Sequence, residues 1–261
     1  MTLNTAKTQT KLEINLDALL HNINELRKFL APETKIMAMV KAFAYGAGAA
    51  EVALFLESNG INYLAVACVD EGIELRAVGV VLPIIVLNPN PSDFDLVIKY
   101  SLEPDLFSAE LFDSFVSIAK KHGLTNYPVH IKIDTGMHRL GFMPEEIDDL
   151  AQKIKEKKCI KIVSVFSHLA GSGNPDLDNF TKNQVEAFLS ACSKLHSATG
   201  YPFMKHILNS SGIVRMPQYR FDMVRPGISM YGAGIFAGMS LKPVSRFSSV
   251  ISQIKNHQLD F

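Results

Sequence analysis

Short apolar runs alternate with amphipathic segments along most of the chain. Continuous apolar runs bounded by polar or glycine-containing turns are typical of strands that are buried on both faces. Between them, apolar residues recur at helical spacing and predict helices, the first with Asp17 as its candidate N-cap. The predicted strands cover 36–41, 63–67, 84–87, 103–107, 129–134, 162–168, 203–209 and 223–227. The predicted helices cover 17–30, 49–58, 70–78, 109–122 and 176–198, with shorter ones after Pro91 and near Pro144.

Eight strands in regular alternation with helices predict an α/β fold, the closed (β/α)8 or TIM barrel. Such a barrel takes about 250 residues, and this chain has 261. The competing architecture is a doubly wound open sheet. It is disfavoured because no G-x-G-x-x-G sequence follows the first predicted strand. In addition, polar residues stand at the ends of many strands rather than at one switch point.

Composition excludes several classes of protein. Lysine and arginine (26) balance aspartate and glutamate (26), so we expect no nucleic-acid partner, which would require a basic surplus or stripe. The densest basic run, 153–161, is interpreted as a solvated helix face. Three scattered cysteines predict neither a disulfide framework nor a zinc site. The chain shows neither an export signal nor an apolar stretch long enough for a bilayer, so we expect a cytoplasmic protein without membrane contact.

The predicted strand ends carry the chemistry, because in a barrel they converge on one mouth. Lys41, His168, Asn209 and Arg225 each close an apolar strand. Lysine is rare in a buried strand, and one crowded by other cations is a better nucleophile toward an aldehyde. The further candidates are Tyr45, Lys132 and Arg139. Together they predict a cationic pocket suited to a phosphate and a carboxylate.

Several of these residues also have ordinary structural explanations. A single histidine such as His168 is more often a satisfied core residue than a functional one. The sequence Asn209-Ser210-Ser211-Gly212 is equally compatible with a turn and helix cap or with a phosphate cradle of backbone N–H groups. The eight histidines lack metal-ligand spacing, so no metal site is predicted.

Three motifs, in order, resemble the barrel domain of bacterial alanine racemases, pyridoxal phosphate (PLP) enzymes of fold type III. The first is Met39-Val40-Lys41-Ala42-Phe43-Ala44-Tyr45-Gly46-Ala47-Gly48, in which Phe43 and Ala47 depart from the common Asn and His. The second runs from Lys132 through Asp134-Thr135-Gly136-Met137-His138-Arg139 to Phe142. The third is Val224-Arg225-Pro226-Gly227-Ile228-Ser229-Met230-Tyr231-Gly232. The similarity covers nearly the whole chain.

The resemblance implies a role for each candidate. Lys41 would hold PLP through a Schiff base and act as base on one face of the substrate α-carbon. Arg225 would contact the pyridine nitrogen with His168 behind it, and Arg139 would contact the cofactor and the substrate carboxylate. Lys132, at a position that is carbamylated in some members, would support that arginine. The phosphate ligands would be Tyr45, Asn209, Ser210, Gly227 and Ile228.

The resemblance also implies a second domain. In the family, the opposing base is a tyrosine from a C-terminal β domain of the partner subunit in a dimer. Residues 241–255 resemble the start of that domain, so we assign 1–238 to the barrel and 239–261 to the start of a truncated β domain. No tyrosine present matches the catalytic one. We therefore expect about 20 β-like residues without a partner sheet, and a chain that is inactive alone.

The function expected from the resemblance is racemisation of alanine, which supplies D-alanine for peptidoglycan precursors. Two alternatives remain open. One is a single-barrel PLP-binding protein without racemase activity. The other is a phosphate-binding barrel enzyme that uses Lys41 as an aldolase-type base. The sequence does not decide between alanine and serine as substrate.

Overall fold

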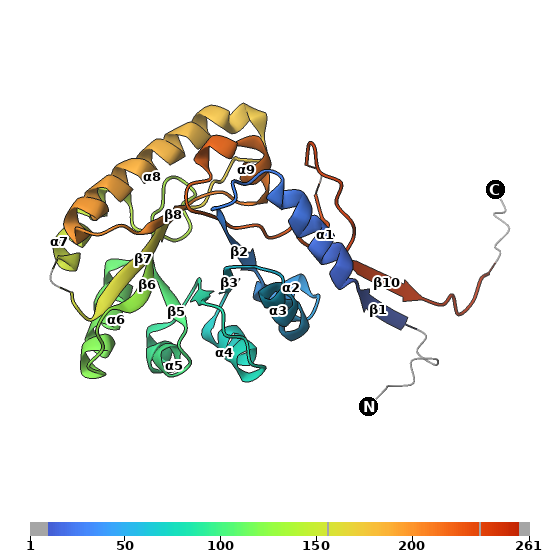
Figure 1. Ribbon diagram of the computed structural model, residues 1–261, viewed down its shortest axis with the longest axis horizontal. Helices are drawn as coiled ribbons and strands as arrows, with labels where there is room; N and C mark the ends of the chain where they lie inside the picture. The colour runs from blue at the N-terminus through green and yellow to red at the C-terminus, as the bar shows by residue number, and fades with distance from the viewer. Residues whose placement is uncertain (1–9, 156, 235, 256–261) are drawn as a thin grey trace, which may run out of the picture.

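A computed structural model describes residues 10–155, 157–234 and 236–255. Eight parallel strands form one sheet in the order β8-β7-β6-β5-β4-β3-β2-β9, curved into a barrel with helices outside (Figure 1). The strands are β2 (Lys35–Met39), β3 (Tyr63–Val66), β4 (Ile84–Val86), β5 (Glu103–Leu106), β6 (Tyr127–Lys132), β7 (Ile160–Phe166), β8 (Met204–His206) and β9 (Met223–Val224). Between the outermost strands, Asp222 N donates to Lys205 O and Arg225 N to Leu208 O, so the barrel prediction is confirmed.

The helices follow the predicted order. They are α1 (Leu16–Arg27), α2 (Lys41–Tyr45), α3 (Ala49–Ser58), α4 (Val69–Ala77), α5 (Phe94–Lys99), α6 (Ala109–Lys121), α7 (Ile147–Ile154), α8 (Asp178–Thr199) and α9 (Ser210–Arg215). Short 3-10 turns precede several of them: η2 (Pro91–Asp93), η3 (Pro144–Glu146) and η4 (Pro175–Leu177), with η5 (Pro217–Tyr219) following α9. Within the described residues, no helix is both long and apolar enough to cross a bilayer.

Two local predictions were wrong. The N-cap of α1 is Asn15, whose side chain accepts from Ala18 N at 2.9 Å, while Asp17 lies in the first turn and favours the helix dipole. The basic run 153–161 is not a helix face, because α7 ends at Ile154 and β7 begins at Ile160. Residue 156 of that run lies outside the described residues.

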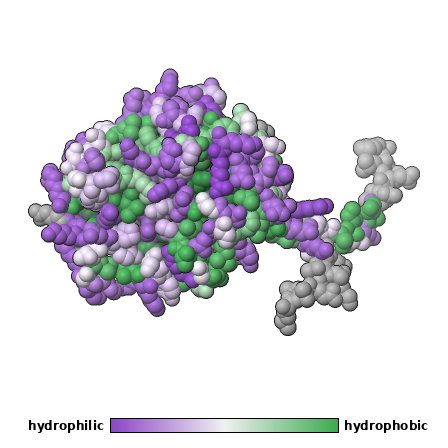
Figure 2. All heavy atoms as spheres, in the orientation of Figure 1, coloured by the Kyte–Doolittle hydropathy of each residue, from purple (hydrophilic) through white to green (hydrophobic). Residues whose placement is uncertain are grey.

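A two-stranded arm projects from the barrel (Figure 1). In it β1 (Thr10–Ile14) pairs antiparallel with β10 (Ser245–Ser249), so the expectation that the C-terminal segment lacks a partner strand was wrong. The amino-terminal strand had no apolar run to reveal it. Apolar side chains nevertheless remain on the surface toward the end of the arm (Figure 2), among them Phe247, Val250 and Ile251.

Candidate functional site

All ten residues predicted for the site line one pocket, of about 240 Å³, at the carboxyl ends of the barrel strands. This is the end at which barrel enzymes place their active sites. Met39, Leu87, Phe166 and Ser211 complete its wall. The predicted residues in the pocket are Lys41, Tyr45, Lys132, Arg139, His168, Asn209, Ser210, Arg225, Gly227 and Ile228. The structure thus brings the candidates together, while their individual roles stay predictions.

Lys41 is followed by an unusual backbone segment. Ala42, Phe43, Ala44 and Tyr45 have φ of 52, 54, 52 and 56°, a left-handed turn of non-glycine residues. Such backbone costs about 1–2 kcal/mol per residue and persists only where surrounding contacts fix it. Here a carboxylate of α4 provides that contact: Glu71 accepts from Ala42 N at 2.7 Å and from Ala67 N at 2.6 Å. The turn therefore holds Lys41 and Tyr45 at the same pocket.

Arg225 is buried and is held by hydrogen bonds through both of its Nη atoms. Its Nη1 donates to His206 Nδ1 at 2.8 Å and to His206 O at 3.1 Å, and its Nη2 donates to Ser167 O at 2.6 Å. The guanidinium also lies over the ring of Phe166, 5.1 Å from its centroid. Burial lowers the pKa of Arg225 to about 10, so the side chain remains a cation at neutral pH. It is a rigid donor at the pocket wall.

His168 lies beside Arg225, as expected, but its contact with Arg225 is weaker than that of His206. Its Nδ1 is 3.4 Å from Arg225 Nη2, and β7 ends two residues earlier, at Phe166. Burial, followed by the charges of Arg225 and Arg139, lowers the pKa of His168 to about 3. Burial and Arg225 hold the pKa of His206 well below its ordinary value as well. Both imidazoles are therefore neutral at physiological pH.

Lys132 is the last residue of β6 and points toward a buried carboxylate. Its Nζ lies 3.9 Å from Asp105 Oδ2 and over the ring of Phe166. Within the part of the chain that the structure describes, neither Asp105 oxygen has a hydrogen-bond partner, and the side chain is 0% exposed. Burial raises the pKa of Asp105 to about 8 and lowers the pKa of Lys132, while each partner opposes the other's shift. The family resemblance connects Lys132 with Arg139, whereas in the structure Lys132 forms an ion pair with Asp105.

Arg139 is carried by the loop after β6 and is exposed at the pocket rim. Asp134 organises that loop, because its carboxylate accepts from the backbone N–H groups of Gly136, His138 and Arg139. Burial alone would raise the pKa of Asp134, but these three hydrogen bonds outweigh it and lower the pKa. The loop backbone is therefore ordered while the guanidinium remains available to an anion.

The opposite wall contains a small hydroxyl-rich cradle. Asn209 caps α9 through its side chain, which accepts from Gly212 N at 3.0 Å. Ser210 Oγ accepts from Gly227 N at 3.1 Å, from Ser229 N at 3.3 Å and from Ser229 Oγ at 2.8 Å. The Ser210 hydroxyl proton is thus left to donate into the pocket. The Gly227 N–H, predicted to face a phosphate, instead donates to Ser210.

Gly227 is required here for space. A Cβ at this position would lie 2.7 Å from the Tyr45 hydroxyl, and Tyr45 in turn stacks on Tyr231 with ring centroids 4.8 Å apart. Burial raises the pKa of Tyr45, which therefore stays protonated and can donate. The arrangement of hydroxyl donors and close backbone suits a phosphate group. Among the described residues, no cluster of His, Cys, Asp or Glu could hold a metal ion.

Sequence analysis missed Asp105, His206 and Glu71. Each lies within a predicted strand or helix, where it looked like an ordinary element residue. The available signal was a charged or imidazole side chain inside an otherwise apolar strand, as in Glu-Pro-Asp-Leu at 103–106 and Met-Lys-His at 204–206. Strand pairing across the barrel is what connects Asp105 and His206 to the predicted residues.

Known proteins resemble this chain in both sequence and fold. The family model "Alanine racemase, N-terminal domain" matches residues 14–234. An alanine racemase of Treponema denticola is 38% identical over 258 residues, which are 96% of this chain and 68% of the relative. The chain spans about two thirds of the length of the curated relatives it matches.

Solved structures show the same relationship. The alanine racemase of Clostridium difficile 630 in complex with cycloserine has a TM-score of 0.90 at 35% identity, covering 97% of this chain and 71% of that one. The alanine racemase of Bartonella henselae with covalently bound pyridoxal phosphate has a TM-score of 0.79 at 28% identity, covering 92% and 66%. By family model, sequence identity and fold, this chain belongs to the alanine racemase family.

Proposed function

We propose that this chain is the barrel part of an alanine racemase that interconverts L- and D-alanine with PLP as cofactor. The observation that carries the proposal is the pocket itself, which combines Lys41 just after β2, a hydroxyl-rich cradle and three further cations. Tyr45 and Ser210 would hold the phosphate of the cofactor through their hydroxyl groups, and Arg225 would contact its ring from another part of the same pocket. PLP, when bound, supplies an electron-withdrawing ring that acidifies the α-proton of an attached amino acid.

The residues then have separate tasks. Lys41 holds the cofactor and moves the proton on one face of the α-carbon. Tyr45 and Ser210 bind the phosphate by donating hydrogen bonds, with Asn209, Gly227 and Ile228 forming the surrounding wall. Arg139 receives the substrate carboxylate, for which a bidentate guanidinium is well suited.

Arg225 would donate a hydrogen bond to the ring nitrogen of the cofactor. A guanidinium has no atom that can accept a proton, and it is a poorer proton donor than a carboxylic acid. It therefore does not favour a protonated ring nitrogen. This limits electron withdrawal and helps confine the chemistry to removal and return of one proton. The neutral His168 beside it adds no charge to the same wall.

Racemisation needs a proton removed from one face and returned to the other, so it needs a second acid or base opposite Lys41. We infer that this group is a tyrosine contributed by the partner subunit of a homodimer, as the resemblance implies. We also propose that the protein is cytoplasmic and that its D-alanine would enter peptidoglycan precursors there. The assignment 1–238 to the barrel and 239–261 to the start of a β domain belongs to this proposal.

The test follows α-proton exchange in deuterated water. Purified protein loaded with PLP is incubated with L-alanine or D-alanine, with exchange measured by NMR and inversion by chiral chromatography. We expect exchange biased toward D-alanine, the enantiomer that the family's lysine serves, with little inversion by the chain alone. Full inversion would show that a second base lies within these 261 residues. Absence of both cofactor binding and exchange would refute the proposed function.

A further inference from the structure

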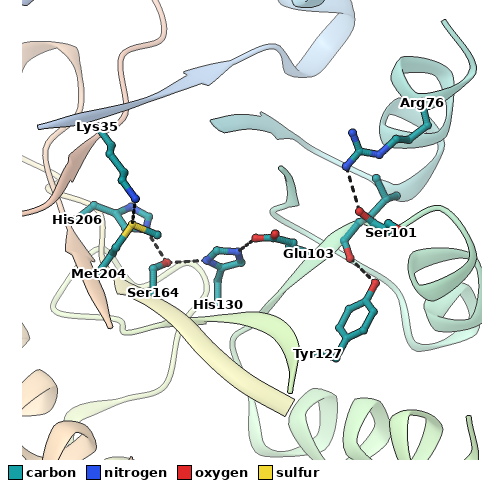
Figure 3. A network of polar contacts seen from close by, with 10 residues as sticks. Lys35, Arg76, Ser101, Glu103, Tyr127, His130, Ser164, Met204 and His206 are labelled. Carbon is teal, nitrogen blue, oxygen red and sulfur yellow. Dashed lines mark hydrogen bonds and ion pairs between the residues drawn. The ribbon is translucent and has the colours of Figure 1, made fainter. Parts of the chain in front are cut away.

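A continuous series of buried polar side chains crosses the barrel interior from Arg225 to Glu103 at the beginning of β5. Figure 3 shows its members from His206 to Glu103. Arg225 contacts His206 at 2.8 Å, His206 Nε2 lies 2.8 Å from Ser164 Oγ, and Ser164 Oγ lies 2.6 Å from His130 Nδ1. His130 Nε2 then lies 2.7 Å from Glu103 Oε2. His206, Ser164 and His130 are 0% exposed, so no solvent competes for these bonds. The series takes one residue from each of β5, β6, β7 and β8, and it ends at Arg225, the residue that follows β9.

The chemistry of the first member sets the direction of every bond. Guanidinium nitrogens only donate, so His206 Nδ1 must accept and its proton must sit on Nε2. That proton is donated to Ser164 Oγ. The serine proton is then donated to His130 Nδ1, which leaves the His130 proton on Nε2, directed at the Glu103 carboxylate. In this arrangement each proton has one acceptor, and the two imidazoles are neutral.

A charged His130 would leave the series less well satisfied. It would donate to both Ser164 and Glu103, so the serine oxygen would accept twice. The serine proton would then have no acceptor among the described partners of Ser164, which are the two histidines. A buried hydroxyl proton without an acceptor is costly. The low pKa of His206 agrees with a neutral ring.

Packing holds the rings where these bonds require them. His206 stacks face to face on Phe166, with centroids 4.8 Å apart and an interplanar angle of 5°. The same Phe166 lies under Arg225. His130 meets Tyr63 edge to face at 6.3 Å. Neither imidazole can therefore rotate freely to reverse its donor and acceptor.

From these contacts we propose that Glu103 and Ser164 are positioning residues for Arg225, acting through a one-way chain of hydrogen bonds that ends at the Glu103 carboxylate. An oxygen acceptor at the far end receives the His130 Nε2 proton, so both ends of the series favour the same direction and His206 Nδ1 stays an acceptor for the guanidinium. The proposal rests on the proposed function for what Arg225 contacts, namely a cofactor ring. The direction of these hydrogen bonds, in contrast, is a property of the protein without cofactor.

The first test is histidine NMR on the cofactor-free protein with 15N-labelled imidazoles. We expect His130 and His206 to be neutral and protonated at Nε2. Glu103→Gln keeps an oxygen acceptor and should preserve both signals, whereas Glu103→Leu should release the His130 tautomer. A doubly protonated His130, or a proton on Nδ1 of either ring, would overturn the proposal.

The second readout is hydrogen exchange of the Arg225 guanidinium, again without cofactor. Ser164→Ala interrupts the chain and should speed this exchange by about tenfold, the effect of one buried hydrogen bond. The matched control is Thr181→Val, which removes a buried hydroxyl that donates to Leu177 O at the end of η4, outside the series, and should leave the exchange unchanged. Equal exchange in Ser164→Ala and wild type would overturn the positioning role. A further outcome is that PLP fails to bind even though the tautomer and hydrogen-exchange results are as expected. That outcome would refute the proposed function but not the hydrogen-bond series from Arg225 to Glu103.

Discussion

The barrel interior has two unlike halves. Strands β2, β3, β4 and β9 fill theirs with an apolar cluster, Met37, Met39, Tyr63, Ala65, Ile85 and Met223. Strands β5 to β8 direct polar and charged groups inward, namely Asp105, His130, Lys132, Ser164 and His206, all buried. The apolar half is a packed core of the ordinary kind. The polar half is no more exposed to solvent than the apolar half. Its polar groups therefore depend on one another for hydrogen bonds and for opposite charges.

This difference explains where the pocket lies. Lys41 leaves the end of β2 at the edge of the apolar half, while Lys132, His168 and Arg225 face it from the polar half or its border. One wall is therefore set by the shape of packed side chains and the other by a network of hydrogen bonds and charges. Changes in the two halves should have different consequences, as the following experiments would show.

The largest effect is expected from Lys41→Ala. Removal of the amine should abolish the absorbance band that PLP gives when joined to the protein. It should also slow α-proton exchange of D-alanine by about 10²- to 10⁴-fold, the usual contribution of a positioned base. Lys182→Ala, on the exposed side of α8, is the matched control. A band that persisted in Lys41→Ala would contradict the assignment of this lysine.

The next effect is on stability in the polar half. Lys132→Met removes the cation beside Asp105, whose pKa is already raised to about 8, so the carboxyl is protonated at neutral pH and remains as a buried polar group without a partner. This should lower the free energy of unfolding by about 1–3 kcal/mol. Replacing both partners, as in Lys132→Met with Asp105→Leu, should restore most of that loss because no unpaired polar group then remains buried. Urea unfolding of the single and double variants measures both values. Additive losses would show that the two side chains do not interact.

A smaller effect concerns pH. The folded pKa of His168, about 3, lies below the ordinary value of 6.5, so between these values the unfolded chain binds more protons. The stability due to a neutral His168 is fully present above pH 6.5 and is lost as the pH falls toward 3. His168→Gln should reduce the slope of stability against pH by up to about 1.4 kcal/mol per pH unit. Unfolding between pH 5 and 7 measures this, with exposed His196→Gln as control; an unchanged slope would contradict it.

The smallest effect is expected in the apolar half. Met37 is fully buried there, and Met37→Leu keeps the volume and adds no polar group. We expect a loss of less than about 1.5 kcal/mol and no change in α-proton exchange. Thermal and urea unfolding measure the first and NMR the second. A large loss of exchange would mean that this half does more than pack.

Sequence patterns predicted the fold well because each barrel strand is buried on both faces and so appears as a short apolar run. Such runs located all eight strands, and the polar residues at or near their ends indicated most of the pocket residues, while Gly227 and Ile228 came only from the family resemblance. Local features that depend on one hydrogen bond were harder. Asn15 rather than Asp17 caps α1 because only its side chain reaches Ala18 N. The left-handed turn at 42–45 has no glycine to announce it and is held by the distant Glu71.

By itself, the sequence determined the order of strands, the ends at which Lys41, Arg139 and Arg225 stand, and the family motifs that contain them. Only the tertiary structure decided which buried polar groups meet. Asp105 faces Lys132 and Glu103 faces His130 because parallel pairing of β5 with β6 places their inward positions side by side. Likewise, β1 is a strand only because β10 lies beside it. Partners far apart in the chain leave no local pattern, since their register is set by closure of the barrel.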